Sequence, residues 1–366
     1  MIKEGHFGSA EAFCLMLVML TTRVFYSSPL ALIKDLGTAA WYGTLLSCAV
    51  SLIFFGLLYL LMKRFPNQDL YQVYETVTGK IISKLLILIF SFYFLYYAAI
   101  NVREFTAILK AYSMPYTPVS ILIFVFLLVV IAMTYVGLEG IVRVSYIFFY
   151  FIMCGLAMLL LLAIPAYDFN NLYPLFGYGL KETIKIGVLR SSAYDEIVIL
   201  AIIINSIYGL KTFKRVGFYS LILAGLIISV TLACILAAFE YTAASEQLSG
   251  LFQLSRIIYY SRFFQRIEAI FLFIWVFASV ITVSMAFYLA VSSYCRAFKI
   301  KNHRPLLFPF AALAFMVAFI PRNIGEVFEI HVHFLRQDSF SIMYLIPLLV
   351  LIFALILGKK GGKAIE

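Results

Sequence analysis

Ten apolar segments, separated by short polar or basic stretches, run along nearly the whole chain. A helix that crosses a bilayer needs roughly 20 predominantly apolar residues, and each segment comes close to that length. Charged residues make up only 13% of the chain, against roughly 25% in soluble proteins. The sequence therefore predicts an all-α integral membrane protein, with residues 1–366 forming a single membrane domain of ten transmembrane helices. The predicted helices lie at about 7–34, 39–62, 81–109, 117–136, 142–165, 190–210, 216–240, 266–294, 305–321 and 339–358.

The loops between these segments indicate the orientation. Clusters such as Lys63 with Arg64, and Lys359 with Lys360, place more basic residues on the side of the N-terminus than on the opposite side. Cytoplasmic loops are enriched in Lys and Arg, so we expect both termini in the cytoplasm. The net charge of +10 belongs to this pattern, and no nucleic-acid partner is predicted. The polar stretch 67–79 is expected to form a short helix on the inner surface.

Neither a cofactor, a metal site nor an enzyme active site is indicated. The five cysteines are scattered through apolar segments without a CxxC pair, so we interpret them as packing residues. His331 and His333 form a weak metal pattern that lacks a third ligand, and we place them in a solvated outer loop before the last helix. No catalytic cluster and no phosphate-binding glycine loop is present in the sequence.

Two of the segments are interrupted by polar residues. In the first, the apolar run ends at Thr21, Thr22 and Arg23, and the sixth opens with RSSAYDE (190–196) before a short apolar run. Unwound backbone is tolerated inside a membrane only where it is buried in protein or lines a cavity. We therefore expect breaks near 21–24 and 192–196 that face each other across a central pocket.

The spacing of the two breaks predicts how the chain is organised. They stand five helices apart, and broken helices at matching positions of two halves are typical of inverted-repeat transporters. We predict two inverted five-helix repeats, at about 7–165 and 190–358, joined by an extracytoplasmic segment, 166–189.

Arg23 needs an explanation, because an arginine near the middle of a membrane helix costs at least ~2.5–3.5 kcal/mol on insertion scales. One interpretation is that it snorkels or pairs with a carboxylate, for which Glu11, Glu104 and Glu196 are candidates. The other is that it lines the pocket and meets an anionic group of a ligand, since the guanidinium fork can grip a carboxylate with two hydrogen bonds. The two interpretations are compatible.

Three stretches carry a resemblance to a known family. NNLYPLFGYGL (170–180) resembles the N-N-L-x-P-x-x-G-x-G-L stretch of the B subunits of bacterial spore-germination receptors. FQRIEAIFLFIWVFA (264–278) is similar to the beginning of their helix 8: Arg266, Glu268 and Trp275 match, and Gln265 replaces an acid. GLEGIVRVSYI (137–147) resembles the inner loop between their helices 4 and 5. The resemblance covers nearly the whole chain.

The resemblance implies a LeuT/APC-like fold with broken helices 1 and 6, because that family belongs to the amino acid–polyamine–organocation transporter superfamily. It also implies a multi-pass protein of the spore inner membrane that binds a germinant, often an amino acid, in a transporter-like pocket. The implied partners are a larger A subunit and a C-subunit lipoprotein. Thr21, Thr22 and Arg23 stand where the family's first break is typically rich in glycine. We therefore expect a ligand that differs from a small apolar amino acid.

The candidate ligand-binding residues come from helices 1, 3, 6 and 8, and each also has a structural interpretation. Glu196 matches the family's acid in helix 6 and either binds ligand or fixes the break. Arg103 and Glu104 form either a structural ion pair or an outer gate. The full predicted ligand-binding set is Thr21, Thr22, Arg23, Val24, Tyr97, Asn101, Ser192, Ala193, Tyr194, Glu196, Ser279 and Thr282, and the predicted structural residues are Arg266, Glu268 and Trp275.

Three functions are weighed on this basis. A germinant-sensing receptor subunit is the leading hypothesis and an amino acid permease is the alternative. A purely structural scaffold would not need the polar breaks. The predicted fifth helix contains no charged residue, whereas some proton-coupled members of the superfamily place a lysine there. This absence favours the sensor.

Overall fold

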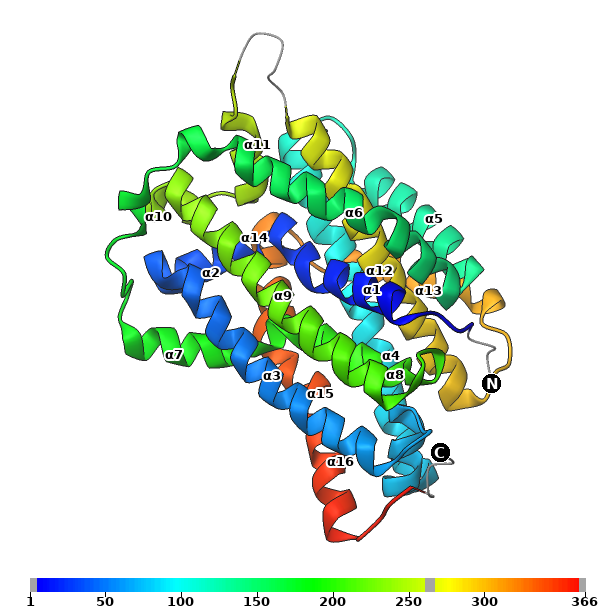
Figure 1. Cartoon of the computed structure of the whole chain (residues 1–366). Coiled ribbons are helices and arrows are strands. Elements are labelled where there is room, and N and C mark those ends of the chain that lie inside the picture. The colour runs from blue at the N-terminus through cyan, green and yellow to red at the C-terminus, as the bar shows by residue number, and fades with distance from the viewer. Residues whose placement is uncertain (1–4, 261–266, 362–366) are drawn as a thin grey trace.

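A computed structural model describes residues 5–260 and 267–361 of the chain. Within these ranges the chain is helical, apart from connecting loops and one isolated bridge between Phe7 and Ile207 (Figure 1). The longer helices are α1 (Ser9–Thr22), α2 (Ser28–Leu36), α3 (Ala40–Arg64), α4 (Leu70–Tyr112), α5 (Val119–Val136), α6 (Leu138–Leu162), α7 (Leu180–Leu189), α9 (Gly209–Ala238), α11 (Gly250–Ile257), α12 (Glu268–Phe298), α13 (Leu307–Ala318) and α16 (Leu345–Ile356). The short α-helices are α8 (Ile199–Ile202), α10 (Tyr241–Ser245), α14 (Ile324–Glu326) and α15 (Phe340–Met343).

Seven helical stretches among the described residues are long and apolar enough to cross a membrane. An eighth apolar stretch, Arg304–Ala318, is shorter. The two remaining predicted spans are helices 1 and 6, which are interrupted. The chain is thus an all-helical, multi-pass membrane protein, as the sequence predicts.

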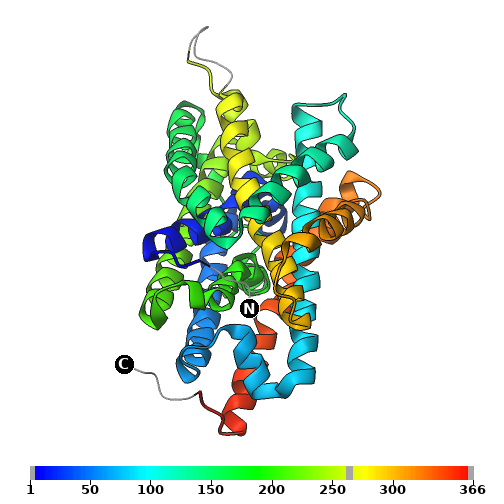
Figure 2. The same cartoon turned by 90° about the vertical axis from the view of Figure 1, so that its right-hand side faces the viewer.

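The first interruption lies in the middle of the molecule. Helix α1 ends at Thr22, a single 3-10 turn follows at Arg23–Phe25, and α2 begins at Ser28. Helix α1 packs against α6, α9 and α12, while α4 runs along α12 and α3 runs along α9 (Figures 1 and 2).

Two glycines with positive φ mark helix boundaries, one before the third predicted helix and one between the fourth and the fifth. Gly79 (φ 82°) separates the start of α4, where the polar stretch 67–79 was expected to form a short helix, from its long apolar part. Gly137 (φ 95°) turns the chain directly from α5 into α6, a backbone conformation that glycine adopts without strain. The fifth predicted helix therefore begins at Leu138, earlier than the predicted 142, and Gly137 alone separates it from α5.

The last helix begins well before residue 339. After Asn323, whose side chain caps the backbone N–H of Glu326 at 2.8 Å, the chain is helical to Ile356 and includes π-helical turns at Val327–Val332 and Phe334–Asp338. The placement of His331 and His333 in an outer loop is therefore wrong. Arg336 is buried in the second of these turns.

Candidate functional site

The break in helix 1 is produced by the sequence Ser27–Ser28–Pro29. Proline has no N–H and its ring clashes with the preceding helical turn, but it fits the first turn of a new helix. Pro29 is the second residue of α2, and Tyr26 before it has extended backbone. The break is thus centred a few residues later than predicted.

Thr21 and Thr22 are not part of the break. They form the last turn of α1, and their hydroxyl groups donate to the carbonyls of Leu17 (2.7 Å) and Val18 (2.6 Å). Their predicted place in an unwound segment is therefore wrong, since both residues are helical and each hydroxyl is bonded within its own helix.

Side chains from distant elements satisfy the backbone at the break. The Glu104 carboxylate, on α4, accepts from both the backbone N–H (3.0 Å) and the hydroxyl (2.5 Å) of Ser27. The Ser249 hydroxyl donates to the Phe25 carbonyl at 3.0 Å. Buried backbone groups are costly when unpaired, so these two contacts are what makes irregular backbone possible here.

Helix 6 differs from the prediction in a specific way. Residues Arg190–Val198 form a nine-residue 3-10 helix, continued by α8, and α7 precedes it. The backbone is therefore wound more tightly than an α-helix rather than unwound. The segment 180–189, predicted as part of an extracytoplasmic connection, is the helix that leads into this segment.

An ion pair joins the two interruptions. Arg23 Nη2 contacts Glu196 Oε2, and both side chains are almost fully buried, with 4% and 3% exposed. The Tyr97 hydroxyl donates to the other oxygen of Glu196 at 2.6 Å. The predicted pairing of Arg23 with Glu196 is confirmed, and contact of either residue with a ligand stays a prediction.

The pair sits within a wider network of buried charge. The Asp195 carboxylate accepts from Ser339 (2.6 Å) and Tyr93 (3.2 Å). Arg336 Nη2 lies 3.9 Å from Glu104 Oε2 and 3.4 Å from the Asn101 side-chain oxygen. Glu104 therefore pairs with Arg336 and Ser27, and the expected Arg103–Glu104 ion pair does not form.

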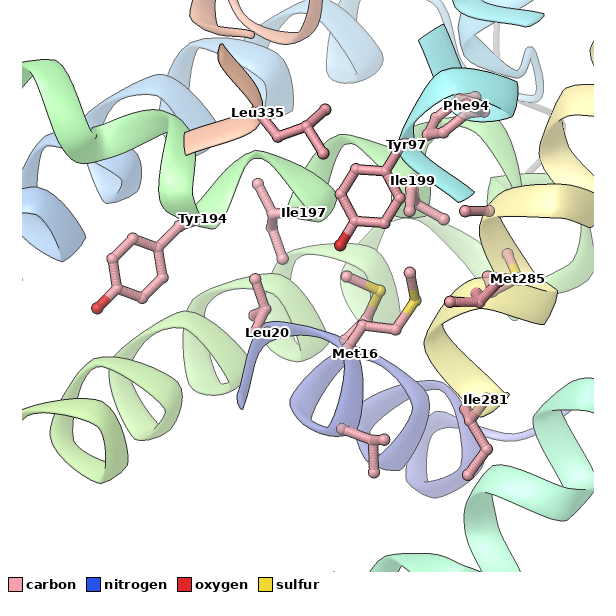
Figure 3. Packing of buried hydrophobic residues seen from close by; sticks show 14 of the residues in the cluster. Met16, Leu20, Phe94, Tyr97, Tyr194, Ile197, Ile199, Ile281, Met285 and Leu335 are labelled. Carbon is pink, nitrogen blue, oxygen red and sulfur yellow. The ribbon is translucent and has the colours of Figure 1, made fainter. Parts of the chain in front are cut away.

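The 3-10 segment places Tyr194 and Glu196 against different neighbours. Figure 3 shows the Tyr194 ring pointing away from Tyr97, whose hydroxyl donates to Glu196. Tyr97 and Glu196 lie on the central side with Met19, where the side chains pack without a cavity that could hold a water molecule. Tyr194 points toward α3, and its hydroxyl lies 2.7 Å from that of Thr44. The set predicted for one pocket is therefore divided between two sides.

A small cavity, which we call the lateral cavity, lies beside Tyr194. Its volume is about 20 Å³, roughly the room for one water molecule. Four predicted site residues line it: Arg23, Val24, Ala193 and Tyr194.

The remaining candidates have other surroundings. The Ser192 hydroxyl donates to the Arg336 carbonyl at 2.7 Å, and Asn101 donates to the Tyr97 carbonyl at 2.7 Å. Thr282 donates to the Thr22 hydroxyl at 3.0 Å. Ser279 is fully buried on the same helix, and its hydroxyl has no hydrogen-bond partner in the described part of the chain. These hydrogen bonds fit a packing role for Ser192, Asn101 and Thr282.

The structure describes two of the three residues predicted as structural, Trp275 and Glu268. Trp275 is fully buried and its ring packs against Tyr26 (5.7 Å between centroids), Phe105 (4.4 Å) and Phe271 (5.9 Å), next to the helix 1 break. Glu268 is the first residue of α12, and Arg266 lies outside the described residues. That Glu268→Ala lowers the amount of protein in the membrane stays a prediction.

Arg336 and Pro29 are the residues that sequence reasoning missed. Asn323 followed by Glu326 is a helix-start pattern, and it would have placed Arg336 inside the last helix. In the same way, Pro29 after two serines marks the second half of helix 1. No group of three or more His, Cys, Asp or Glu side chains in the described ranges could hold a metal ion, and the His331 ring nitrogen lies 2.7 Å from the Tyr96 hydroxyl instead.

The fold is shared with transporters of known structure. An Na⁺-coupled sialic acid symporter in a substrate-bound outward-open state matches with a TM-score of 0.67 and 11% identity, over 93% of this chain and 80% of that one. A nucleobase-cation-symport-1 family transporter in a closed conformation matches with a TM-score of 0.65 and 11% identity, over 96% of this chain and 90% of that one. At this identity the likeness shows the fold alone.

Sequence comparison identifies the family. Spore germination protein KB of Bacillus subtilis (strain 168) is 24% identical over 278 residues, which are 75% of this chain and 74% of that protein. The putative spore germination protein YfkT of the same strain is 23% identical over 264 residues, 72% of each chain. The family model described as spore germination protein matches residues 8–327. The chain, with its transporter fold and its two interrupted helices, therefore belongs to the spore germination protein family.

Proposed function

We propose that this chain is the nutrient-sensing membrane subunit of a spore germination receptor and binds a small molecule such as an amino acid at Arg23 and Glu196. The observation that carries the proposal is the buried ion pair between the two interrupted helices. A buried ion pair costs desolvation energy and is weak evidence for stability. In a receptor for zwitterions such a pair can bind the ligand, since the ligand carboxylate can replace Glu196 at Arg23 and the ligand ammonium can replace Arg23 at Glu196.

Binding would proceed by exchange of partners. The ligand carboxylate takes the Arg23 guanidinium, and the ligand ammonium takes the Glu196 carboxylate, which keeps its hydrogen bond from Tyr97. Neither buried charge is then left unpaired, so the cost of separating the pair is offset by two charge-assisted hydrogen bonds. The central side is closely packed, so the helices must move apart to admit the ligand.

The proposed organisation follows the same reasoning. Helix 1 comprises α1 and α2, and helix 6 comprises α7, the 3-10 segment and α8. The single domain of ten helices is completed by α3, α4, α5, α6, α9, α12, α13 and the last helical stretch, Ile324–Ile356. Its inverted repeats cover about 7–165 and 180–358, the second beginning earlier than the predicted 190 because α7 belongs to helix 6. We place it in the spore inner membrane with both termini in the cytoplasm, together with the receptor A subunit and the C-subunit lipoprotein.

Ligand exchange at the pair can be tested with purified protein and matched ligands. Labelled alanine is competed by unlabelled alanine, by propionate, which lacks the ammonium, and by ethylamine, which lacks the carboxylate. We expect each single-charge analogue to bind about 10- to 100-fold more weakly, because one hydrogen bond to a charged group is missing. Equal competition by propionate and alanine would contradict a role for Glu196. If alanine itself does not bind, the same three-way comparison is made with another amino acid that triggers germination.

Spores that carry variants test the role of Arg23 in sensing. Arg23→Lys should weaken the germination response, and Arg23→Gly should shift preference toward small apolar amino acids. The matched control is Arg143→Gly, since Arg143 is exposed and its ion pair with Glu139 lies on the surface, where such pairs contribute little. An unchanged response in Arg23→Gly, with normal protein levels, would mean that Arg23 has only a structural role.

A permease is the second candidate, because the chain shares its fold with solute symporters. Uptake of labelled amino acids into proteoliposomes separates the two functions. Concentrative uptake without partner subunits would favour the permease, and saturable binding without uptake would favour the sensor.

A further inference from the structure

The residues that line the lateral cavity are not explained by the ligand binding proposed above for the Arg23–Glu196 ion pair. It lies between the helix 1 break, α3, the 3-10 segment and α9. Its charged lining residues are Arg23 and Arg190, each with a side chain about 95% buried. The carboxylates that pair with them, Glu196 and Asp35, are not part of the lining. Each cation is thus paired outside the lining, and the cavity itself is bordered by cationic and not by anionic side chains. In a buried site that water does not screen, such a lining favours an anion.

Arg23 also has hydrogen-bond donors to spare. Its Nη2 is bonded to Glu196, but Nε and Nη1 are buried without a partner in the described part of the chain. Arg190, in contrast, uses Nε (3.1 Å) and Nη2 (2.6 Å) on Asp35. Buried N–H groups of a charged side chain rarely stay unpaired, so the cavity is the place where a further acceptor belongs.

Hydroxyl groups complete the lining. Tyr194, Thr44, Ser47 and Ser28 supply them, and Ile228 and Leu232 on α9 close the apolar side. Arginine N–H groups only donate, whereas Ser, Thr and Tyr hydroxyls both donate and accept. The two guanidinium groups therefore favour an anion over a cation as the occupant. The volume of about 20 Å³ limits the occupant to a single small group. We propose that the lateral cavity binds a compact monovalent anion, either a free halide such as chloride or the carboxylate group of a bound molecule.

The site can be tested without any germinant, so its failure and the failure of the proposed function are distinguishable. Thermal unfolding of the purified full-length protein is followed while sodium gluconate, too large for the cavity, is replaced by chloride, bromide or formate at constant ionic strength. We expect a saturable rise on the order of 2 °C, because an anion that binds only the folded state stabilises it. A response to halides alone identifies a free ion, and a response to formate alone identifies a carboxylate. An unfolding temperature independent of the anion would overturn the proposal and assign the cavity to water.

A matched pair of serines on α3 localises the effect. Ser47 lines the cavity, whereas Ser51, one turn further, donates to the Ser191 carbonyl and does not line it. Ser47→Ala should raise the half-saturating anion concentration about tenfold, and Ser51→Ala should leave it unchanged. The double variant Arg190→Gln/Asp35→Asn, which removes one cation without changing net charge, should abolish the response. A wild-type response in both cavity variants would show that the anion binds elsewhere.

Discussion

The two interrupted helices are built in opposite ways. In helix 1 the backbone is irregular, and side chains from remote elements satisfy it: Glu104 bonds Ser27, and Ser249 bonds the Phe25 carbonyl. In helix 6 the backbone closes its own 3-10 hydrogen bonds, and its acidic side chains reach outward to Arg23, Tyr97 and Ser339. The stability of the first break therefore depends on distant partners, while the second depends mainly on its own turn-to-turn bonds.

The largest effect is expected where helix 1 depends on α4. Glu104→Ala removes the acceptor for Ser27 and the carboxylate nearest Arg336, and leaves a buried cation without its partner. We expect a loss of about 3–5 kcal/mol in the free energy of unfolding, measured by thermal unfolding in detergent and by protein levels in the membrane. Glu75→Ala, an exposed acid on the same helix, is the control. Equal stability of the two variants would remove the claim that helix 1 depends on this contact.

The next effect concerns the acid of helix 6. Tyr97→Phe removes a hydrogen bond to the Glu196 carboxylate, and hydrogen bonds to charged groups contribute about 1.5–3 kcal/mol. Tyr96→Phe removes the hydrogen bond between the Tyr96 hydroxyl and the His331 ring. We expect this variant to lose less free energy of unfolding than Tyr97→Phe. The comparison is made by thermal unfolding, and by the germination response to alanine. If Tyr96→Phe is the more damaging variant, Tyr97 does not hold the acid.

The smallest effects compare one hydroxyl at each interruption. Ser249→Ala leaves the irregular Phe25 carbonyl unsatisfied and removes the cap of α11, at a cost of about 1–2 kcal/mol. Ser51→Ala removes one bond to the Ser191 carbonyl within the 3-10 segment and should cost about 1 kcal/mol or less. Unfolding temperatures give the order. The reverse order would mean that helix 6, too, relies on outside partners.

Much of the site could be read from residue types, but not its division into two sides. Arg23 inside an apolar run required an anion, and Glu196 in the matching interrupted helix was a named candidate, so their pairing was predictable. Tyr194 and Glu196 are two residues apart in one polar stretch, and were expected to face one pocket. In the structure Tyr194 contacts Thr44 on α3, whereas Glu196 contacts Arg23 and Tyr97, and nothing in RSSAYDE distinguishes a 3-10 helix from an unwound loop.

The amino-acid sequence by itself determined that this protein is a multi-pass helical membrane protein, because long apolar segments can be buried in a bilayer only as helices. It also determined that helices 1 and 6 carry polar interruptions with opposite charges. Only the tertiary structure decided which charges meet. Arg336 reaches Glu104, and Asp35 takes Arg190, across 232 and 155 positions of sequence, because each buried charge is paired with whatever the packing of distant helices brings within reach.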